Sequence, residues 1–281
     1  MVNSLPSVFL VLLNWNGWTD TIQCLASIAQ QDYCTLTVIV VDNGSTDGSV
    51  RKIREAAPEA LLIENAVNLG FSAGCNVGIR HALERGADYI WLLNNDTIVT
   101  TNALRDMVEL AESDRTIGAV GSVIYHMDGD NRLQAWGGGR INLWTGRSCH
   151  LHASGELHYI TGASMLLPAR AIRRVGLLDE SFFLYWDDCD MSLRLRGAGY
   201  RITVASQSII YHKESATVGK RTIRQDRMFS ESTVRFCRKH APIPLLAILI
   251  AVGGRSVKRL LTGRPASAAA VLQGAWQGWL R

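Results

Sequence analysis

The first half of the chain alternates short apolar runs with stretches whose apolar residues recur at helical spacing. The apolar runs are rich in β-branched residues and predict strands at residues 8–13, 36–41, 60–64 and 89–93. The stretches between them predict helices near residues 20–30, 47–56 and 76–85. Because the runs are apolar at successive positions, they fit strands that are covered on both faces. The pattern therefore predicts an α/β fold with a mostly parallel central sheet.

The pattern changes after Val123. Residues 127–146 are rich in turn residues, glycine and tryptophan, which predicts hairpins or a flexible lobe. Beyond them the sequence predicts a strand, a short helix, a longer helix and two more strands, at residues 164–168, 171–175, 187–199, 201–205 and 208–212. We expect one domain over residues 1–231, divided into halves of about 1–123 and 124–231, and a helical tail over residues 232–281.

Charge separates this tail from the rest of the chain. Residues 232–281 hold eight Lys or Arg and no Asp or Glu, whereas the remainder holds 21 basic and 25 acidic residues. A basic segment of this kind suits an anionic membrane surface or nucleic acid.

The apolar residues of the tail favour the membrane. The run Leu245–Val252 is too short to cross a bilayer, which takes roughly 20 residues. Further along, apolar residues recur at helical spacing at Ala268, Val271, Leu272, Ala275, Trp276 and Trp279, and basic residues precede them at Arg255, Lys258, Arg259 and Arg264. We therefore expect residues 242–281 to lie on a membrane surface through an amphipathic helix with tryptophan anchors. The alternative is that the apolar stripe packs on the protein or on a second subunit. Nucleic acid is not expected as a partner.

Cysteine usage indicates a reducing compartment. The six cysteines form no CxxC pair, and no segment resembles a secretory signal. With the tail, this predicts a cytoplasmic protein that is peripheral on the inner face of the cell membrane. The chain has 281 residues, of which 47% are hydrophobic, so it is long enough to bury one large core.

Three polar clusters follow predicted strands, at residues 14–17, 42–48 and 94–96. Because the carboxyl ends of parallel strands share one edge of a sheet, these clusters should meet where such sheets bind ligands. A carboxylate at Asp42 can accept the imide N–H of a pyrimidine base, and the Ser45 hydroxyl can meet a hydroxyl or a phosphate. Asp96 offers the hard oxygen that Mg²⁺ or Mn²⁺ prefers beside a leaving diphosphate. Each cluster taken alone could also be an ordinary turn.

A second acidic concentration spans Asp179–Asp190. Adjacent carboxylates repel each other, which raises a proton affinity and leaves one of them able to act as a base. The alternative is helix N-terminal charge, with Asp190 and Arg194 paired at i,i+4. Cys149, His150 and His152 lack the second ligand pair that a zinc site would need, so zinc is not expected.

Together these motifs resemble glycosyltransferase family 2. The resemblance rests on order and spacing over about residues 8–215, at Val40–Asp47, Asn68–Phe71 with Asn76 and Gly78, Leu93–Asp96, Asp179–Asp188 and His212. The NWNG opening at Asn14 and the LNND motif are similar to the bacterial rhamnosyltransferase-like branch.

The resemblance implies a GT-A fold and an inverting single displacement, in which an aspartate deprotonates the acceptor hydroxyl. It puts Asp188 at the position of the catalytic base and Asp96 and His212 at the metal. The donor nucleotide sugar would be bound by Asn14, Asn16, Asp42, Ser45, Asn68, Gly70, Asn76, Asn95 and Asp187. The chain departs from the usual pattern at Asn94–Asn95, where many members have an aspartate, and at Cys75, where many have arginine.

The expected function is transfer of a hexosyl group, with rhamnosyl the first guess, from a dTDP- or UDP-sugar. The acceptor is expected to be a hydroxyl of a saccharide or lipid-linked saccharide in cell-surface polysaccharide synthesis, with the donor bound by residues 1–123 and the acceptor by residues 124–231. If no metal were used, Arg194 or Lys213 would be the first basic side chains to consider as stabilisers of the leaving group.

Two rival functions remain open. A sugar-phosphate nucleotidyltransferase needs a glycine-rich basic loop after its first strand, but Asn14–Asp20 holds one glycine and no Lys or Arg. A non-catalytic nucleotide-sugar-binding protein would not need both Asp96 and Asp188. The sugar and the acceptor depend on loops in residues 125–160, whose geometry the sequence pattern leaves open.

Overall fold

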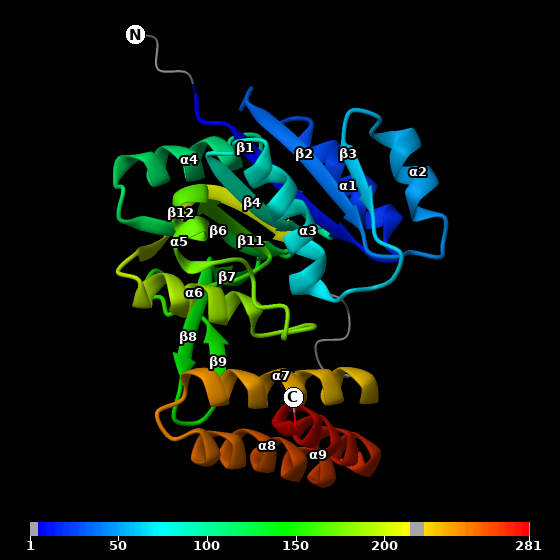
Figure 1. Ribbon diagram of the computed structural model, residues 1–281, viewed down its shortest axis with the longest axis vertical. Coiled ribbons are helices and arrows are strands. Elements are labelled where there is room, and N and C mark those ends of the chain that lie inside the picture. Colours follow the sequence, from blue (N-terminus) through cyan, green and yellow to red (C-terminus); the bar gives the residue numbers. More distant parts are fainter. Residues whose placement is uncertain (1–4, 214–221, 281) are drawn as a thin grey trace.

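The computed structural model describes residues 5–213 and 222–280, so parts of the predicted domain (1–4 and 214–221) and the last residue of the tail lie outside the described residues. Within these residues a nine-stranded sheet forms the centre, in the order β3-β2-β1-β4-β11-β6-β12-β5 with β7 paired to β6 (Figure 1). Its strands are β1 (Val8–Asn14), β2 (Leu36–Asp42), β3 (Leu61–Glu64), β4 (Tyr89–Asn94), β5 (Thr97–Val99), β6 (Ile117–His126), β7 (Leu133–Trp136), β11 (Ser164–Pro168) and β12 (Arg201–His212).

Helices cover both faces of this sheet. One face holds α1 (Trp18–Ile28), α2 (Ser49–Ala56) and α4 (Ala103–Ser113), and the other holds α3 (Phe71–Glu84), α5 (Ala169–Val175) and α6 (Asp187–Gly197). The side chains of β1 alternate between the two cores, with Leu10 and Leu12 in the first and Phe9 and Val11 in the second. This two-sided burial explains why the strand runs are apolar at every position, and it confirms the predicted α/β fold.

Strands β3, β2, β1 and β4 pair in parallel, as predicted. Beyond β4 the sheet is mixed, because β11 runs antiparallel to both β4 and β6 while β12 is parallel to β6. The two strands predicted at residues 201–205 and 208–212 are one strand, β12, with a register shift between Ala205 and Ile209.

Helix α3 begins at Phe71, five residues before the predicted start near residue 76. Gly70, Gly74 and Gly78 make this start hard to predict from the sequence, because glycine lowers helix propensity. Their role is close packing. A Cβ atom on Gly74 would lie 2.6 Å from a methyl of Leu13, and one on Gly78 would lie 2.6 Å from a methyl of Val11.

The turn-rich segment forms hairpins. A second sheet, in the order β10-β8-β9, is built from β8 (Gly138–Asn142), β9 (Arg147–His150) and β10 (Tyr159–Ile160). Its strands approach closely where β8 carries glycine, because a Cβ on Gly138 or Gly139 would lie 1.9 Å from a carbonyl oxygen of a neighbouring strand. This sheet projects from the main sheet towards the C-terminal helices (Figure 1).

The tail forms a unit of three packed helices, α7 (Ile223–His240), α8 (Pro244–Leu261) and α9 (Pro265–Leu280). Helix α9 lies close to α7, because a Cβ on Gly274 would meet the carbonyl oxygen of Arg227 at 2.0 Å. The position at which charge divides the chain, after Glu231, lies within α7. None of the helices in the described residues is long and apolar enough to cross a membrane.

Candidate active site

The three polar clusters meet at the carboxyl ends of β1, β2 and β4. Asn14 pairs in register with Asp42 on one side of β1, and Leu13 pairs with Asn94 on the other. The parallel arrangement predicted from the apolar runs therefore brings these segments to one edge of the sheet.

Asp42 is the centre of a buried hydrogen-bond network. Its carboxylate accepts hydrogen bonds from the Asn14 side chain at 2.7 Å and from the Ser45 backbone N–H at 2.9 Å. Asn16 joins this network, since its backbone N–H donates to the Ser45 hydroxyl and its side chain accepts from Thr46. Asp42 is only 1% exposed. Its hydrogen bonds to Asn14 and Ser45 join the loops that follow β1 and β2.

Asn68 and Gly70 lie just before the first residue of α3. Asn68 accepts a hydrogen bond from Asn43 at 3.0 Å and one from the backbone N–H of Gly70 at 2.8 Å. Asn76 lies deeper and is fully buried. Its side chain binds both the carbonyl and the N–H of Leu178 and the carboxylate of Glu180, so it fixes the loop that leads to α6.

Asp96 and His212 lie together at the end of β4 and β12. The Asp96 carboxylate is 3.2 Å from Nε2 of His212, whose Nδ1 is 3.1 Å from the amide oxygen of Gln134. Asn95 beside them donates to the Thr21 hydroxyl at 2.8 Å. Within the described residues no group of three or more His, Cys, Asp or Glu is arranged to hold a metal. One carboxylate and one imidazole fit a cation that keeps several waters or phosphate oxygens as ligands, as Mg²⁺ does.

Asp187 and Asp188 begin α6, where the backbone is strained. Tyr185 and Trp186 both have a φ of 71°, a region that costs roughly 1–3 kcal/mol for residues with a side chain. Asp188 accepts hydrogen bonds from the backbone N–H groups of Gly162 at 3.1 Å and of Cys189 at 2.7 Å.

These two carboxyl groups have perturbed pKa values. Burial, and then the neighbouring charge of Asp188, raise the pKa of Asp187 to about 8. Burial also raises the pKa of Asp188, and the two backbone N–H groups oppose that rise because they stabilise its ionised form. Of the two, Asp187 has a pKa of about 8 and so holds its proton at neutral pH, whereas only Asp188 accepts two backbone hydrogen bonds that favour an ionised carboxylate.

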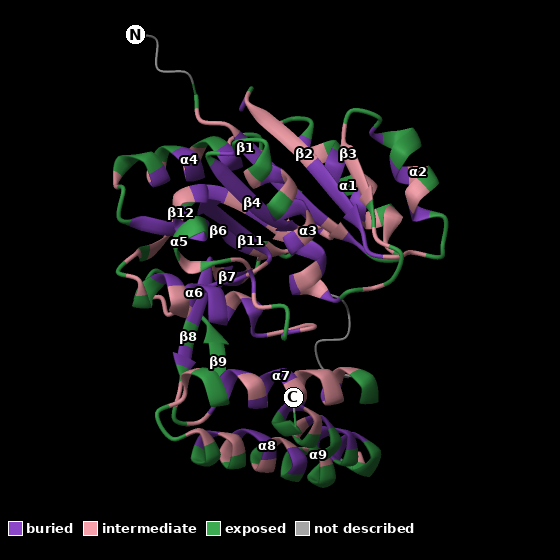
Figure 2. Cartoon of the chain, viewed as in Figure 1, coloured by how far each residue is buried: buried purple, intermediate pink, exposed green. Residues whose placement is uncertain are grey.

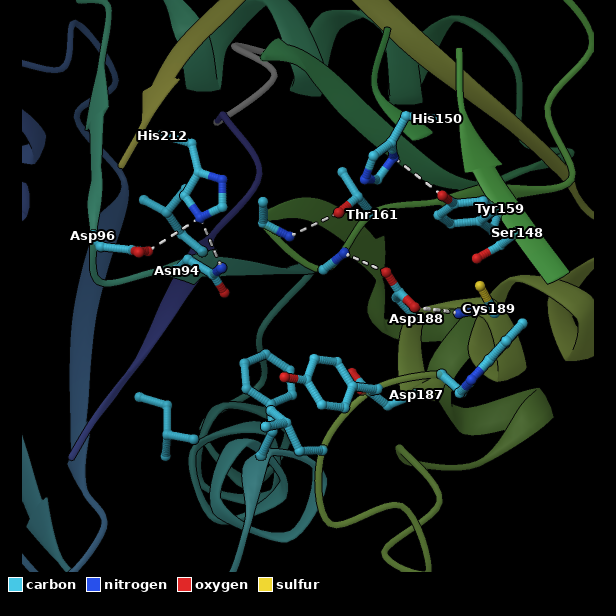
Figure 3. A pocket seen from close by; sticks show the side chains of 18 of the residues that line it. Asn94, Asp96, Ser148, His150, Tyr159, Thr161, Asp187, Asp188, Cys189 and His212 are labelled. Carbon is cyan, nitrogen blue, oxygen red and sulfur yellow. Dashed lines mark hydrogen bonds and ion pairs between the residues drawn. The ribbon is translucent and has the colours of Figure 1, made fainter. Parts of the chain in front are cut away.

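One cavity of about 590 Å³ joins the two acidic groups. It is lined by residues 94–96 and His212 at one end and by Asp187 and Asp188 at the other. Figure 3 shows the Asp96 and His212 side chains apart from the two α6 carboxylates, across this cavity.

The β8–β9 hairpin supplies a wall of the cavity that the sequence pattern did not assign. Ser148, Cys149 and His150 line it together with Tyr159. Nδ1 of His150 is 3.0 Å from the Tyr159 hydroxyl, as the dashed line in Figure 3 marks. Burial raises the pKa of Tyr159 far above its usual value, so this hydroxyl keeps its proton. Pairing across a hairpin depends on tertiary structure, which periodicity along the chain does not report.

Helix α7 holds the segment that carries the two carboxylates. The Trp186 ring stacks on Phe236 with centroids 4.2 Å apart, and its N–H donates to the Thr233 hydroxyl at 3.0 Å. Ser232 donates to the carbonyl of Leu184 at 2.8 Å. These contacts offset the strain at Trp186 and make α7 part of the site.

Asp190 also holds the start of α6 in place, through hydrogen bonds to Arg194 and His240. Burial alone would raise its pKa, but hydrogen bonds from His240 and Lys239 and the charge of Arg194 lower the pKa of Asp190 to about 2. The predicted i,i+4 pair between Asp190 and Arg194 is present at 2.8 Å.

A second cavity of about 360 Å³ continues from the first, and Leu13, Phe71 and Leu184 line both. Asn68 and Gly70 line it, as does Trp15, which is 46% exposed. Two of the predicted donor residues thus face this second cavity, while Asp42 and Asn76 line neither cavity.

Comparison with known proteins supports the resemblance. Residues 8–175 match the family described as Glycosyl transferase family 2. The chain is 26% identical over 220 residues to the N-acetylglucosaminyl-diphospho-decaprenol L-rhamnosyltransferase of Mycobacterium tuberculosis, covering 69% of this chain and 72% of that protein. It is 27% identical over 207 residues to the galactofuranosyltransferase GlfT1 of the same organism, covering 69% and 66%.

Solved structures share the fold. A mannosyltransferase from Pyrobaculum calidifontis, in complex with GDP-Man and Mn²⁺, aligns with a TM-score of 0.64 at 21% identity over 95% of this chain and 74% of that one. GalNAc-T7 with UDP, GalNAc and Mn²⁺ aligns with a TM-score of 0.70 at 12% identity over 95% and 55%. The family match covers more than half of the chain and the fold is that of GT-A enzymes, so this chain belongs to glycosyltransferase family 2.

Proposed function

We propose that the protein transfers a hexosyl group, with rhamnosyl the first candidate, from a dTDP- or UDP-sugar to a hydroxyl of a saccharide or lipid-linked saccharide in cell-surface polysaccharide synthesis. The observation that carries this proposal is the 590 Å³ cavity with Asp96 and His212 at one end and Asp187 and Asp188 at the other. The similarity to a rhamnosyltransferase that acts on a lipid-linked saccharide supports the choice of sugar and acceptor.

The transfer would be a single displacement with inversion. Asp188 takes the proton of the acceptor hydroxyl as that oxygen forms a bond to the anomeric carbon of the donor sugar. The bond between the anomeric carbon and the diphosphate oxygen breaks, and the nucleoside diphosphate leaves from the opposite face. Asp188 suits this role because its two backbone hydrogen bonds hold its oxygens in place and favour the ionised form.

Asp187 has a different proposed role. With a pKa raised to about 8, it is protonated at neutral pH and can donate a hydrogen bond to a hydroxyl of the donor sugar. We keep Asn14, Asn16, Asp42 and Ser45 as donor-side residues that shape the loops around the nucleotide, because their hydrogen bonds join the ends of β1 and β2. On this view residues 1–123 bind the nucleotide of the donor, whereas residues 124–231 bind the acceptor and also supply Asp187 and His212 to the donor side.

Asp96 and His212 would hold Mg²⁺ or Mn²⁺. The ion would neutralise charge on the diphosphate as it leaves. The residues present fit such an ion, because an aspartate oxygen and an imidazole nitrogen lie 3.2 Å apart on the cavity wall.

The rival functions find less support. The β1–α1 loop has no Lys or Arg between Asn14 and Asp20, which disfavours a nucleotidyltransferase. A non-catalytic binding protein has no use for a buried carboxylate pair with raised pKa values beside a cavity.

A panel of nucleotide sugars tests the proposal. Melting temperatures of the purified protein would be measured with each sugar nucleotide, with and without Mn²⁺. We expect dTDP- or UDP-sugars to raise the melting temperature more when Mn²⁺ is present. Slow release of nucleoside diphosphate without acceptor would then separate a transferase from a protein that only binds its ligand.

We further propose that α8 and α9 attach the protein to the cytoplasmic face of a membrane. Many exposed residues of these helices are apolar, and Figure 2 shows α8 and α9, with exposed residues in green, at the end of the molecule away from the main sheet. The exposed large apolar residues of this face are Leu245, Leu246, Leu249, Val257, Leu260, Leu261, Leu272, Trp276, Trp279 and Leu280. Patches of this kind mark interaction sites.

The predicted apolar stripe of the tail is divided between two environments. Ala268 and Val271 are buried in the three-helix unit, whereas Leu272, Trp276 and Trp279 are exposed. Both alternatives drawn from the sequence therefore find support, because one side of α9 packs on the protein and the other is free to meet a second surface.

The charges favour lipid over a second copy of the chain. Arg259 and Arg264 pair with the buried Asp226, at 2.7 and 3.9 Å, so part of the basic charge serves the fold. Lys258 is exposed beside the apolar face. Residues 232–280 contain no Asp or Glu, so the same segment of a second copy would offer Lys258 no opposite charge, whereas an anionic lipid would.

A further inference from the structure

The basic residues first considered for the leaving group have other partners. Arg194 binds the Asp190 carboxylate at 2.8 Å and the carbonyl oxygen of Leu177 at 2.8 Å, and it lines neither cavity. Lys213 binds Asp20 at 2.8 Å. Lys213, like Arg194, lines neither cavity.

Another arginine, Arg224, lines the 360 Å³ cavity. The first turns of α7 close the 360 Å³ cavity with Thr222, Arg224, Gln225 and Met228. The guanidinium of Arg224 is 5.9 Å from the centre of the Trp15 ring, so it reaches across to the loop that follows β1.

Arg224 is distinguished by its charge. Among the described residues that line either cavity, it is the only Lys or Arg. The other side chains of the second cavity are mostly apolar, including Leu13, Phe71 and Phe183. A flat base suits such walls, but a diphosphate needs a cation or hydrogen-bond donors.

The turn that carries Arg224 is well defined. Thr222 and Gln225 form a reciprocal capping box, in which the Thr222 hydroxyl accepts from the Gln225 N–H at 3.2 Å and the Gln225 side chain accepts from the Thr222 N–H at 2.8 Å. The positive end of the α7 dipole lies at the same turn and adds to the attraction for an anion.

We propose that Arg224 binds the phosphate groups of the donor, so that α7 contributes a donor-binding residue from outside the segment that matches the family, residues 8–175. This inference rests on the proposed function, because it takes the donor to be a nucleoside-diphosphate sugar. An arginine suits the task, since its planar guanidinium can bind two phosphate oxygens at once.

The test compares nucleotides with nucleosides. Dissociation constants for UDP, dTDP, uridine and thymidine would be measured by calorimetry on the full chain and on the variants Arg224→Gln, Arg224→Lys and Arg227→Gln. Arg227 is the matched control, because it lies on the same helix but does not line the 360 Å³ cavity. Melting temperatures of all variants establish that they are folded.

We expect Arg224→Gln to weaken UDP or dTDP binding by about tenfold or more and to leave nucleoside binding unchanged. Arg224→Lys should recover part of the loss, and Arg227→Gln should bind as the parent does. An equal loss for the nucleosides would show that Arg224 contacts the base, and an unchanged affinity for the diphosphates would show that it contacts no part of the donor. Either result overturns the inference while leaving the proposed function intact. If the parent bound neither UDP nor dTDP, the proposed function itself would fail and the inference with it.

Discussion

The two neighbouring carboxyl groups at the start of α6 differ in what holds them. Asp188 receives two backbone hydrogen bonds, whereas Asp187 is buried and its pKa is raised to about 8. In an unfolded chain Asp187 would titrate near 3.8. The folded state therefore holds the Asp187 proton over a pH range in which the unfolded state has lost it.

This difference predicts a pH-dependent stability. Since the folded state binds the proton more tightly, the contribution of Asp187 is present at low pH and is lost as the pH rises towards its folded pKa. Asp187→Asn removes this loss, so the melting temperature of the variant should rise relative to the parent between pH 5 and pH 8. Thermal unfolding of both proteins at the two pH values measures the effect. A difference in melting temperature that stays constant with pH would contradict a raised pKa at Asp187.

Asp96 gives a second prediction. Asp96→Ala should lower transfer by about a hundredfold or more and remove the dependence of donor binding on Mn²⁺, because neutral Asn95 cannot replace the lost charge. Excess EDTA should have the same effect on the parent protein. The matched control is Asp20→Ala, a carboxylate that pairs with Lys213 outside the cavity. Full activity in EDTA would rule out a metal and direct attention to basic side chains.

At the level of elements, the close contact between α7 and α9 rests on glycine. A Cβ on Gly274 would lie 2.0 Å from the carbonyl oxygen of Arg227, whereas one on Gly253, in α8, would meet nothing within 4 Å. Gly274→Ala should therefore lower the free energy of unfolding by about 1–3 kcal/mol, as overpacking does. Gly253→Ala should raise it by about 0.5–1 kcal/mol through higher helix propensity. Urea denaturation measures both changes, and equal effects would contradict the packing of α9 on α7.

The sequence predicts the elements that obey a simple period. The parallel strands were predictable because β1, β2 and β4 are apolar at nearly every position and are buried on both faces. The start of α3 could not be predicted from the sequence, because Gly74 and Gly78 are there for close packing against β1. The sequence also did not show that the two predicted strands form one strand, β12, because a register shift interrupts the apolar pattern there.

Candidate site residues could be predicted where a reactive side chain follows a predicted strand or begins a predicted helix. Asp96, His212, Asp187 and Asp188 all line the main cavity. Trp15, His150 and Arg224 were not predicted as site residues, because each reaches a cavity through tertiary packing of a loop, a hairpin or a helix. No spacing along the chain reports such contacts.

At the scale of the whole molecule, the apolar face of α8 and α9 should bind anionic membranes. Liposome flotation would compare the full chain with a variant that carries Leu249→Gln and Trp276→Gln, two residues that are 69% and 63% exposed. We expect the parent to float with anionic vesicles and the variant to stay mostly in the soluble fraction, because lost apolar burial weakens interfacial binding. Val67→Gln, a change at a residue that is 61% exposed but lies outside these helices, is the control. If the parent remained soluble with anionic and neutral vesicles alike, the face would be reassigned to contact between subunits.

The most direct test of the account is sugar transfer by the intact protein and by its Asp188→Asn variant. Release of nucleoside diphosphate from the donor that raises the melting temperature most would be followed, and the anomeric configuration of the product would be read by NMR. We expect inversion in the parent, and in the variant a loss of about a hundredfold or more in rate with donor binding retained. Asp179→Asn is the matched control, because this carboxylate lies in the loop before α6 and binds Lys239 outside the cavity. Transfer by Asp188→Asn at a rate near that of the parent would contradict the assignment of Asp188 as the base.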